Sequence, residues 1–387
     1  MKLRTIVAVA GLAAMSLAAC GSGAGGSGED VIKVAVLDAQ SGKFSDFGID
    51  VERGARMAFD EINEAGGVTV GGKTYKFKYE ITDLQSDPTV AAQAAQQAVS
   101  GGTKILIGAT VSALTEPITG VVQRSGGQVL QIGMATSLDR HVGKKDPIFR
   151  TLPSDEVMAK QYIPVLRKEF PDVKTIGSLM INDAVGQSIL KIYTPLFEEN
   201  GFKVASQDTF PSDETNFAPL LQRSAKDAQA FFVGYTDPVG KAVVNAALEA
   251  GKAKIFFNRG SVCQVGMEFG DKIDAFACQI VGDDPVKPSS DEAKQWFAKY
   301  EREFKTKPNA NVAYAISYYD TVYLLKQALE KAGTVDDVQK IADALRGAQY
   351  KGISEIGFDE SGLSTTKIRV GIVRKGELSV HEGAPLS

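Results

Sequence analysis

Hydrophobic and polar residues follow two patterns along this chain, one typical of buried strands and one typical of amphipathic helices. Residues 31–37 form an apolar run broken only by Lys33, as expected for a strand that is covered on both faces. Farther along, four apolar residues are spaced by four, three and four positions and therefore share one face of a predicted helix. They are Val51, Ala55, Ala58 and Ile62.

The alternation of strands and helices continues to residue 281. Further strands are predicted at residues 75–82, 105–107, 129–132, 175–181, 202–210, 231–233, 255–257, 275–281 and 367–373. Helices are predicted from Pro88 onward and at residues 114–124, 186–200, 217–225, 239–250, 291–305, 312–332 and 335–345. The order of elements in the first half is repeated in the second, without residue-level identity between the halves.

Strands that alternate with helices of this length predict an α/β fold with two lobes, each a doubly wound parallel sheet. We expect a multi-strand hinge between the lobes, with crossovers at residues 151–154 and near Pro285 and Pro288. The N-terminal lobe is predicted to contain residues 31–153 and 285–348. The C-terminal lobe is predicted to contain residues 154–284 and 349–387.

Ligands of such sheets bind beyond the carboxyl ends of the strands. This rule nominates the loops at residues 38–47, 108–112 and 133–137 in the first lobe, and those at 182–186, 235–238 and 258–260 in the second. If these loops face each other, the lobes form a cleft that can close on a ligand.

The first twenty residues are typical of an export signal. Lys2 and Arg4 precede a short apolar stretch at residues 6–14, which is too short to span a bilayer because a spanning helix needs about 20 apolar residues. Residues 17–20 read Leu-Ala-Ala-Cys, which resembles the lipobox of bacterial lipoproteins and implies lipidation of Cys20. The alternative is a plain secretory signal with an incidental cysteine. Residues 21–30 are mostly Gly and Ser and predict a flexible linker.

Composition excludes several classes of function. Lys and Arg number 43 against 47 Asp and Glu, a formal charge of -4, so the chain has no basic field for a nucleic acid. Two histidines and three cysteines leave little material for a metal site. We therefore predict no catalytic residues, no metal and no cofactor.

Two glycine-rich motifs are poor candidates for nucleotide sites. The G-x-G-x-x-G pattern at Gly21, Gly23 and Gly26 has neither the strand before it nor the helix after it that dinucleotide binding requires. The G-x-x-x-x-G-K-T pattern at residues 67–74 follows a helix and precedes a strand, which is the reverse of a phosphate loop, so we interpret it as a hairpin turn.

The loops carry motifs in a recognisable order. They are Ser41-Gly42, Phe47-Gly48, Ile62-Asn63, Gly66-Gly67, Gly108 with Ser112, Ala135-Thr136 and Tyr319-Asp320. Together with the lipobox they resemble the type I extracytoplasmic solute-binding proteins, in the branch that delivers branched-chain amino acids, amides and urea to ABC importers. The resemblance runs from Val31 onward and implies a closing cleft without catalysis and docking to a membrane permease. We expect the protein to be a monomer.

The resemblance also implies a set of ligand-binding residues. Ser112 matches a serine that meets a ligand carboxylate, and Pro117 supports its place at the start of a helix, although Ser112 could simply cap that helix. Thr136 and the backbone of Ala135 match a second set of contacts, with a threonine that bonds its own backbone as the alternative. The remaining matches are the aromatic residues Phe47, Tyr235 and Tyr314, which could instead be core residues, and Asp155, which could instead be a helix cap.

Two positions depart from the family pattern. Arg259 stands where amino-acid binders carry an acidic residue for the ligand ammonium, and a cation there favours a carboxylate or an amide oxygen. Alternatively, Arg259 pairs with Asp155, Asp183 or Asp237. Val185 stands where an aromatic residue is usual.

The expected function is a lipid-anchored, extracytoplasmic substrate-binding protein of an ABC importer that captures a small amino acid or a related carboxylate or amide. A ligand-sensing module for a signalling partner is the alternative. After lipidation of Cys20, Cys263 and Cys278 remain either as a disulfide or as two buried thiols.

Overall fold

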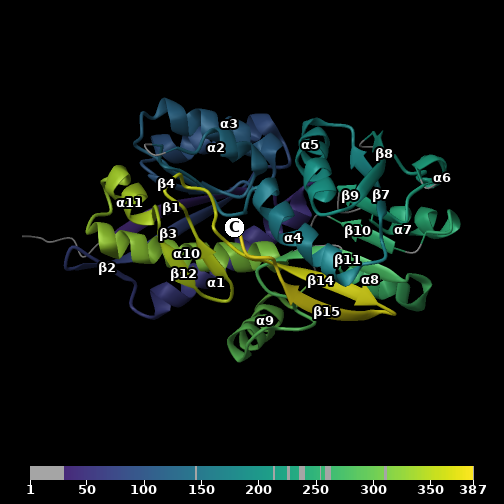
Figure 1. Ribbon diagram of the computed structural model, residues 1–387. Coiled ribbons are helices and arrows are strands. Elements are labelled where there is room, and N and C mark those ends of the chain that lie inside the picture. Colours follow the sequence, from purple (N-terminus) through teal and green to yellow (C-terminus); the bar gives the residue numbers. More distant parts are fainter. Residues whose placement is uncertain are drawn as a thin grey trace, which may run out of the picture.

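Two sheets flanked by helices form two lobes that lie side by side (Figure 1). The computed structural model describes residues 30–143, 146–211, 214–224, 227–234, 240–252, 254–257, 263–308 and 312–386. The predicted two-lobed α/β fold is confirmed.

The first lobe is built on a six-stranded sheet in the order β2-β3-β1-β4-β5-β6. Its strands are β1 (Val31–Asp38), β2 (Val68–Val70), β3 (Lys73–Asp83), β4 (Ile105–Ile107), β5 (Leu130–Gly133) and β6 (Ile148–Arg150). Alternate residues of β1 enter two different cores, Val34 and Val36 on one face and Ala35 and Leu37 on the other. The apolar run therefore reflects burial on both faces, as predicted.

Helices cover both faces of this sheet. They are α1 (Ser45–Glu64), α2 (Pro88–Ser100), α3 (Ser112–Arg124), α10 (Val312–Ala332) and α11 (Val338–Leu345). Asp87 caps α2 by accepting hydrogen bonds from the amides of Thr89 and Val90, and Pro88 occupies the first helical position, where a missing N–H costs nothing. The late helix α10 packs against α1, so segments far apart in the sequence share one core.

The second lobe is built on a seven-stranded sheet in the order β15-β14-β11-β10-β9-β7-β8. Its strands are β7 (Thr175–Ile181), β8 (Lys203–Phe210), β9 (Ala230–Gly234), β10 (Lys254–Phe257), β11 (Ala275–Val281), β14 (Ile368–Arg374) and β15 (Glu377–Glu382). The helices of this part are α4 (Asp155–Glu169), α5 (Ala184–Glu199), α6 (Ala218–Ser224), α7 (Gly240–Glu249) and α8 (Cys263–Phe269). Further elements are α9 (Asp291–Phe304) and a small hairpin of β12 (Gln349–Lys351) and β13 (Glu355–Gly357).

Both sheets are parallel in their centres but mixed at one edge. The turn at Gly71 and Gly72 joins β2 to β3, and the turn at Lys375 and Gly376 joins β14 to β15. Two residues are too few for the crossover that a parallel pair requires, so both pairs are antiparallel. The phosphate-loop-like motif at residues 67–74 is thus a hairpin, as predicted.

The chain passes between the lobes three times: after β6, after β11 and before β14. The helix α4, which follows the first passage, contacts α5, β11 and β14 of the second lobe. It was not predicted, and Pro164 in its interior is a residue that usually ends a helix. The residue limits proposed for the two lobes remain a prediction.

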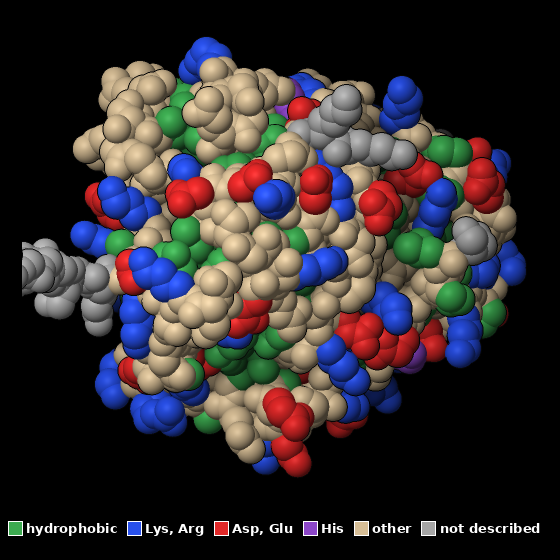
Figure 2. Space-filling view, turned by 90° about the vertical axis from the view of Figure 1, so that its left-hand side faces the viewer, with side chains coloured by type: hydrophobic (Ala, Val, Ile, Leu, Met, Phe, Trp, Pro, Cys, Tyr) green, Lys and Arg blue, Asp and Glu red, His purple; other side chains and the backbone are tan. Residues whose placement is uncertain are grey.

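The surface carries mixed charge. On the face of the first lobe shown in Figure 2, Lys and Arg side chains are interspersed with Asp and Glu side chains. Such a face offers no extended basic field to a nucleic acid. In the described parts of the chain, no helix combines the length and the apolar character needed to cross a bilayer.

Candidate functional site

A cavity of about 270 Å³ lies between the two lobes, at the carboxyl ends of their strands. We call it the central cavity. Its lining from the first lobe comprises Phe44, Phe47, Thr110, Val111, Ser112, Ala113, Met134, Ala135, Leu152 and Tyr314. Its lining from the second lobe comprises Asp183, Val185, Ile189 and Gly234. This is where open α/β sheets bind ligands.

A buried carboxylate holds two of the lining loops together. Asp38, at the end of β1, is 1% exposed and accepts hydrogen bonds from the amides of Ala39 and Thr110, each at 2.9 Å. It also accepts one from Thr110 Oγ1 at 2.5 Å. Burial raises the pKa of Asp38 to about 6, although the bonds from Thr110 and Ala39 oppose that rise. Asp38 thereby positions Thr110 at the cavity wall.

Ser112 is the first residue of α3, and it lines the central cavity. The N-cap residue is Val111, whose side chain makes no capping hydrogen bond. The roles of Ser112 in ligand binding and in capping α3 therefore both remain predictions. Pro117 lies in the interior of α3 and not in its first turn, which makes it a poor argument for the position of Ser112. Amide groups at a helix start lack intrahelical partners and favour an anion.

Ala135 and Thr136 follow β5. Ala135 is buried and lines the cavity, and its carbonyl accepts the Leu138 amide at 3.1 Å. Thr136 begins a short 3₁₀ helix, Thr136–Arg140. The side chain of Thr136 lies outside the described part of the structure.

The structure brings two of the predicted aromatic residues together. Phe47 on α1 and Tyr314 on α10 both line the cavity, and their rings meet edge to face with centroids 5.6 Å apart. Both side chains are half-buried. Since α1 and α10 are more than 250 residues apart in the sequence, only the packing of these helices creates the pair.

Asp155 lines a neighbouring cavity of about 590 Å³ that shares Ser112, Ala113 and Val185 with the central one. Ser154 Oγ accepts the Val157 amide at 3.2 Å, so Ser154 is the cap of α4. Asp155 follows in the first turn and is 6% exposed.

Three predicted residues lie outside the described part of the chain: Cys20, Tyr235 and Arg259. The same holds for Asp237, an alternative partner of Arg259. Their roles remain predictions.

Several lining residues were missed by the sequence analysis. Four of them lie in loops that the strand-end rule nominates, namely Phe44, Thr110, Met134 and Asp183. Treating every residue of these loops as a candidate ligand contact would have found them. Leu152 lies in a segment that passes between the lobes, and Ile189 lies within α5. No local sequence signal marks these two as cavity residues.

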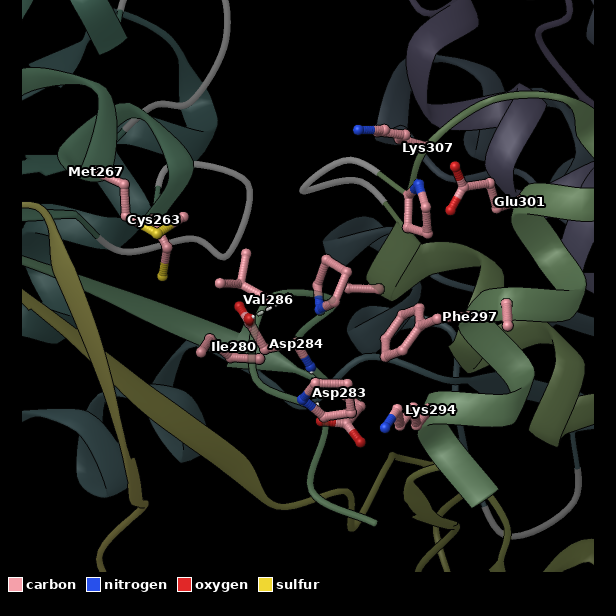
Figure 3. Close-up of a pocket in the computed structure, with 15 residues that line it drawn as sticks. Cys263, Met267, Ile280, Asp283, Asp284, Val286, Lys294, Phe297, Glu301 and Lys307 are labelled. Atoms are coloured by element: carbon pink, nitrogen blue, oxygen red, sulfur yellow. Dashed lines mark hydrogen bonds between the residues drawn. The ribbon is translucent and has the colours of Figure 1, made fainter. Parts of the chain in front are cut away.

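A larger cavity of about 710 Å³ lies beside the passage that follows β11 (Figure 3). Met267 lines it from α8, Phe297 lines it from α9, and Asp283 lies between them. Asp283 accepts hydrogen bonds from Ser289 Oγ and Arg369, both at 2.7 Å, which ties this passage to β14. We assign this cavity to the hinge.

Cys263 lies at the edge of that cavity and forms a disulfide with Cys278 on β11. Their Cα atoms are 5.5 Å apart. The bridge joins α8 to the sheet of the second lobe. Among the described residues, no group of three or more His, Cys, Asp and Glu side chains could hold a metal ion.

The comparisons with known proteins agree with this architecture. Residues 31–369 match the model of the periplasmic binding protein family. The leucine-, isoleucine-, valine-, threonine- and alanine-binding protein of Pseudomonas aeruginosa is 26% identical over 371 residues, covering 93% of this chain and 92% of that protein. The Leu/Ile/Val-binding protein BraC3 of Rhizobium johnstonii is 25% identical, covering 87% and 89%.

The crystal structure of the substrate-binding protein LivJ of Streptococcus pneumoniae in complex with isoleucine superposes with a TM-score of 0.74. It is 22% identical and covers 92% of this chain and 100% of that one, which shows a shared fold. The chain therefore belongs to the periplasmic binding protein family, whose members are extracytoplasmic solute-binding proteins and not enzymes.

Proposed function

We propose that this chain binds a small apolar α-amino acid of the branched-chain class and delivers it to an ABC importer. The observation that carries the proposal is the central cavity, which combines an apolar wall with a helix start. Phe47, Met134, Leu152 and Ile189 supply apolar surface, while Ser112 begins α3. Its volume lies near the small end of the range for ligand sites, roughly 300–1,000 Å³.

Each part of the cavity has a role for such a ligand. The ligand carboxylate accepts hydrogen bonds at the start of α3, where Ser112 and the positive end of the helix dipole favour an anion. The branched side chain displaces water from the apolar wall, at about 25 cal/mol for each Å² removed from water. Because both lobes line the cavity, a bound ligand favours their closure.

The relatives support this ligand class, since two of them are named for branched-chain amino acids. Arg259 remains the predicted cation at the mouth of the second lobe, and Tyr235 the predicted aromatic contact. Thr136 and Ala135 remain the predicted second set of contacts beside Ser112.

We also propose that Cys20 carries a lipid anchor and that residues 21–30 tether the monomeric binding lobes to the cell membrane. The Leu-Ala-Ala-Cys run and the Gly- and Ser-rich composition support this proposal. Stable anchoring needs two or more acyl chains, which a diacylglyceryl group supplies. The tether keeps the protein beside its permease.

Isothermal titration calorimetry of the protein that begins at Gly21 tests the ligand class. We expect leucine, isoleucine and valine to bind, and urea and glucose not to bind. Ser112→Ala should weaken leucine binding by about tenfold, because a bond to a charged group is worth about 1.5–3 kcal/mol. Ser125→Ala, at the other end of α3, is the matched control and should leave the affinity unchanged. Folded protein that binds none of the three amino acids would refute the proposal.

A further inference from the structure

We propose that Asp183 receives the ammonium group of the ligand and thereby selects α-amino acids over carboxylates that lack an amine. This inference rests on the proposed function, because it concerns the same cavity. Among the described lining residues of the central cavity, Asp183 is the one with a charged side chain. A zwitterion that leaves water for a largely apolar cavity needs an anion for its ammonium group.

The two lobes present opposite charges to the cavity. The first lobe contributes the start of α3, with the positive end of the helix dipole and Ser112. The second lobe contributes Asp183, which lies between the end of β7 and the start of α5. A zwitterion placed between them meets an anion-binding group on one lobe and a carboxylate on the other. Its two charges therefore join the lobes, whereas a carboxylate that lacks an amine cannot pair with Asp183.

Asp183 is held in place by its own helix. It is the N-cap of α5, and its Oδ1 accepts the Gly186 amide at 2.8 Å. An ionised carboxylate has about four acceptor positions, so this capping bond leaves capacity for an ammonium group. Asp183 is exposed, so a ligand that enters the cavity can reach it. Capping fixes its orientation and lowers the entropy cost of pairing.

Asp155 is the competing acid, and the geometry favours it less. It lines the neighbouring cavity and not the central one, among the charged groups Glu116, Asp139 and Arg140. It is also 6% exposed. An ammonium group at Asp155 would therefore lie outside the apolar wall that receives the side chain of the ligand.

The test compares two ligands that differ in the amine alone, leucine and 4-methylpentanoate, by calorimetry at pH 7. Wild-type protein should prefer leucine by at least about tenfold. Asp183→Asn keeps an efficient N-cap and the side-chain size but removes the charge. We expect it to lose at least about tenfold in leucine affinity and little or none in 4-methylpentanoate affinity, so that the preference disappears. Asp183→Ser is a second capping variant, in case the asparagine variant does not fold.

The matched control is Asp337→Asn, which changes the N-cap of α11 in the same way at a site outside the cavity lining. It should leave both affinities unchanged. The proposal is overturned if Asp183→Asn keeps its preference for leucine at an unchanged melting temperature, or if Asp155→Asn abolishes the preference instead. Wild-type protein that binds leucine and 4-methylpentanoate equally overturns it as well. Wild-type protein that binds no amino acid refutes the proposed function itself.

Discussion

At the scale of single residues, the cavity depends on polar side chains placed at the ends of strands or shortly after them. Asp38 follows the apolar residues of β1, and Asp183 comes two residues after β7. The first is fully buried and joins two loops, while the second is exposed and caps a helix. The same residue type therefore has two roles, and its surroundings decide which.

The buried state of Asp38 predicts a characteristic dependence of stability on pH. Burial raises the pKa of its carboxyl group from 3.8 to about 6. Between these values the folded protein holds more protons than the unfolded chain, so this group contributes less to stability as the pH rises. Relative to Asp38→Asn, the unfolding free energy of the wild type should fall by at most about 1.4 kcal/mol per pH unit in that window. Urea unfolding at pH 4 to 8 measures the difference.

Asp87→Asn is the matched control for this experiment. Hydrogen bonds from the amides of Thr89 and Val90 lower the pKa of Asp87, so its contribution to stability is present above the unfolded pKa and is lost as the pH falls. Between pH 4 and 8 the difference in unfolding free energy between wild type and Asp87→Asn should therefore stay nearly constant, whereas the difference for Asp38→Asn should change with pH. A constant difference between wild type and Asp38→Asn from pH 4 to 8 would contradict the buried, proton-binding state of Asp38.

At the scale of secondary-structure elements, the contact between α1 and α10 decides where Phe47 and Tyr314 lie. The helices approach closely at Gly54, where an added Cβ atom would come within 1.9 Å of the Ala315 carbonyl oxygen. Glycine at position 54 permits this close contact. An alanine there fits only if the backbone of α1 or α10 moves.

Gly54→Ala should therefore destabilise the protein by about 1–3 kcal/mol, the usual cost of overpacking. It should also weaken ligand binding, because α10 carries Tyr314 to the cavity wall. Gly120→Ala in α3 is the control: its Cβ would meet only the Arg124 side chain, at 3.4 Å. Alanine there should stabilise the helix by roughly 0.5–1 kcal/mol. Equal effects of the two substitutions in a urea titration would refute the close contact.

At the scale of the whole molecule, ligand capture involves the two lobes, whereas delivery involves the proposed membrane anchor. Three passages join the lobes on either side of the central cavity, and hydrogen bonds to Asp283 tie one of these passages to β14. The proposed anchor at Cys20 and the linker at residues 21–30 keep the lobes near the membrane without restricting their motion.

This arrangement predicts that Cys20→Ala releases the protein from the membrane. We expect the variant to move from the membrane fraction to the soluble fraction while its affinity for leucine stays unchanged, because the linker separates the anchor from the lobes. Fractionation of cells that express either form, followed by immunoblotting, measures the change. Ser22→Ala, two residues farther on, is the control and should remain with the membrane. A Cys20→Ala variant that stays firmly membrane-bound would rule out the lipid anchor.

The sequence by itself determined the two-lobed α/β class and many of the elements, although not α4. Apolar periodicity is a local property, so β4, β7, β11 and α10 have the predicted limits. The rule that ligands bind beyond strand ends also nominated the loops that contain four of the cavity residues, namely Phe47, Ser112, Ala135 and Asp183.

The tertiary structure alone decided which of these residues share one cavity. It pairs Phe47 with Tyr314, adds Leu152 and Ile189 to the wall, and assigns Asp155 to a neighbouring cavity. It also sets β14 antiparallel to β11, although the two strands are far apart in the sequence. These features depend on contacts between residues far apart in the chain, and such contacts leave no periodic trace in the local sequence.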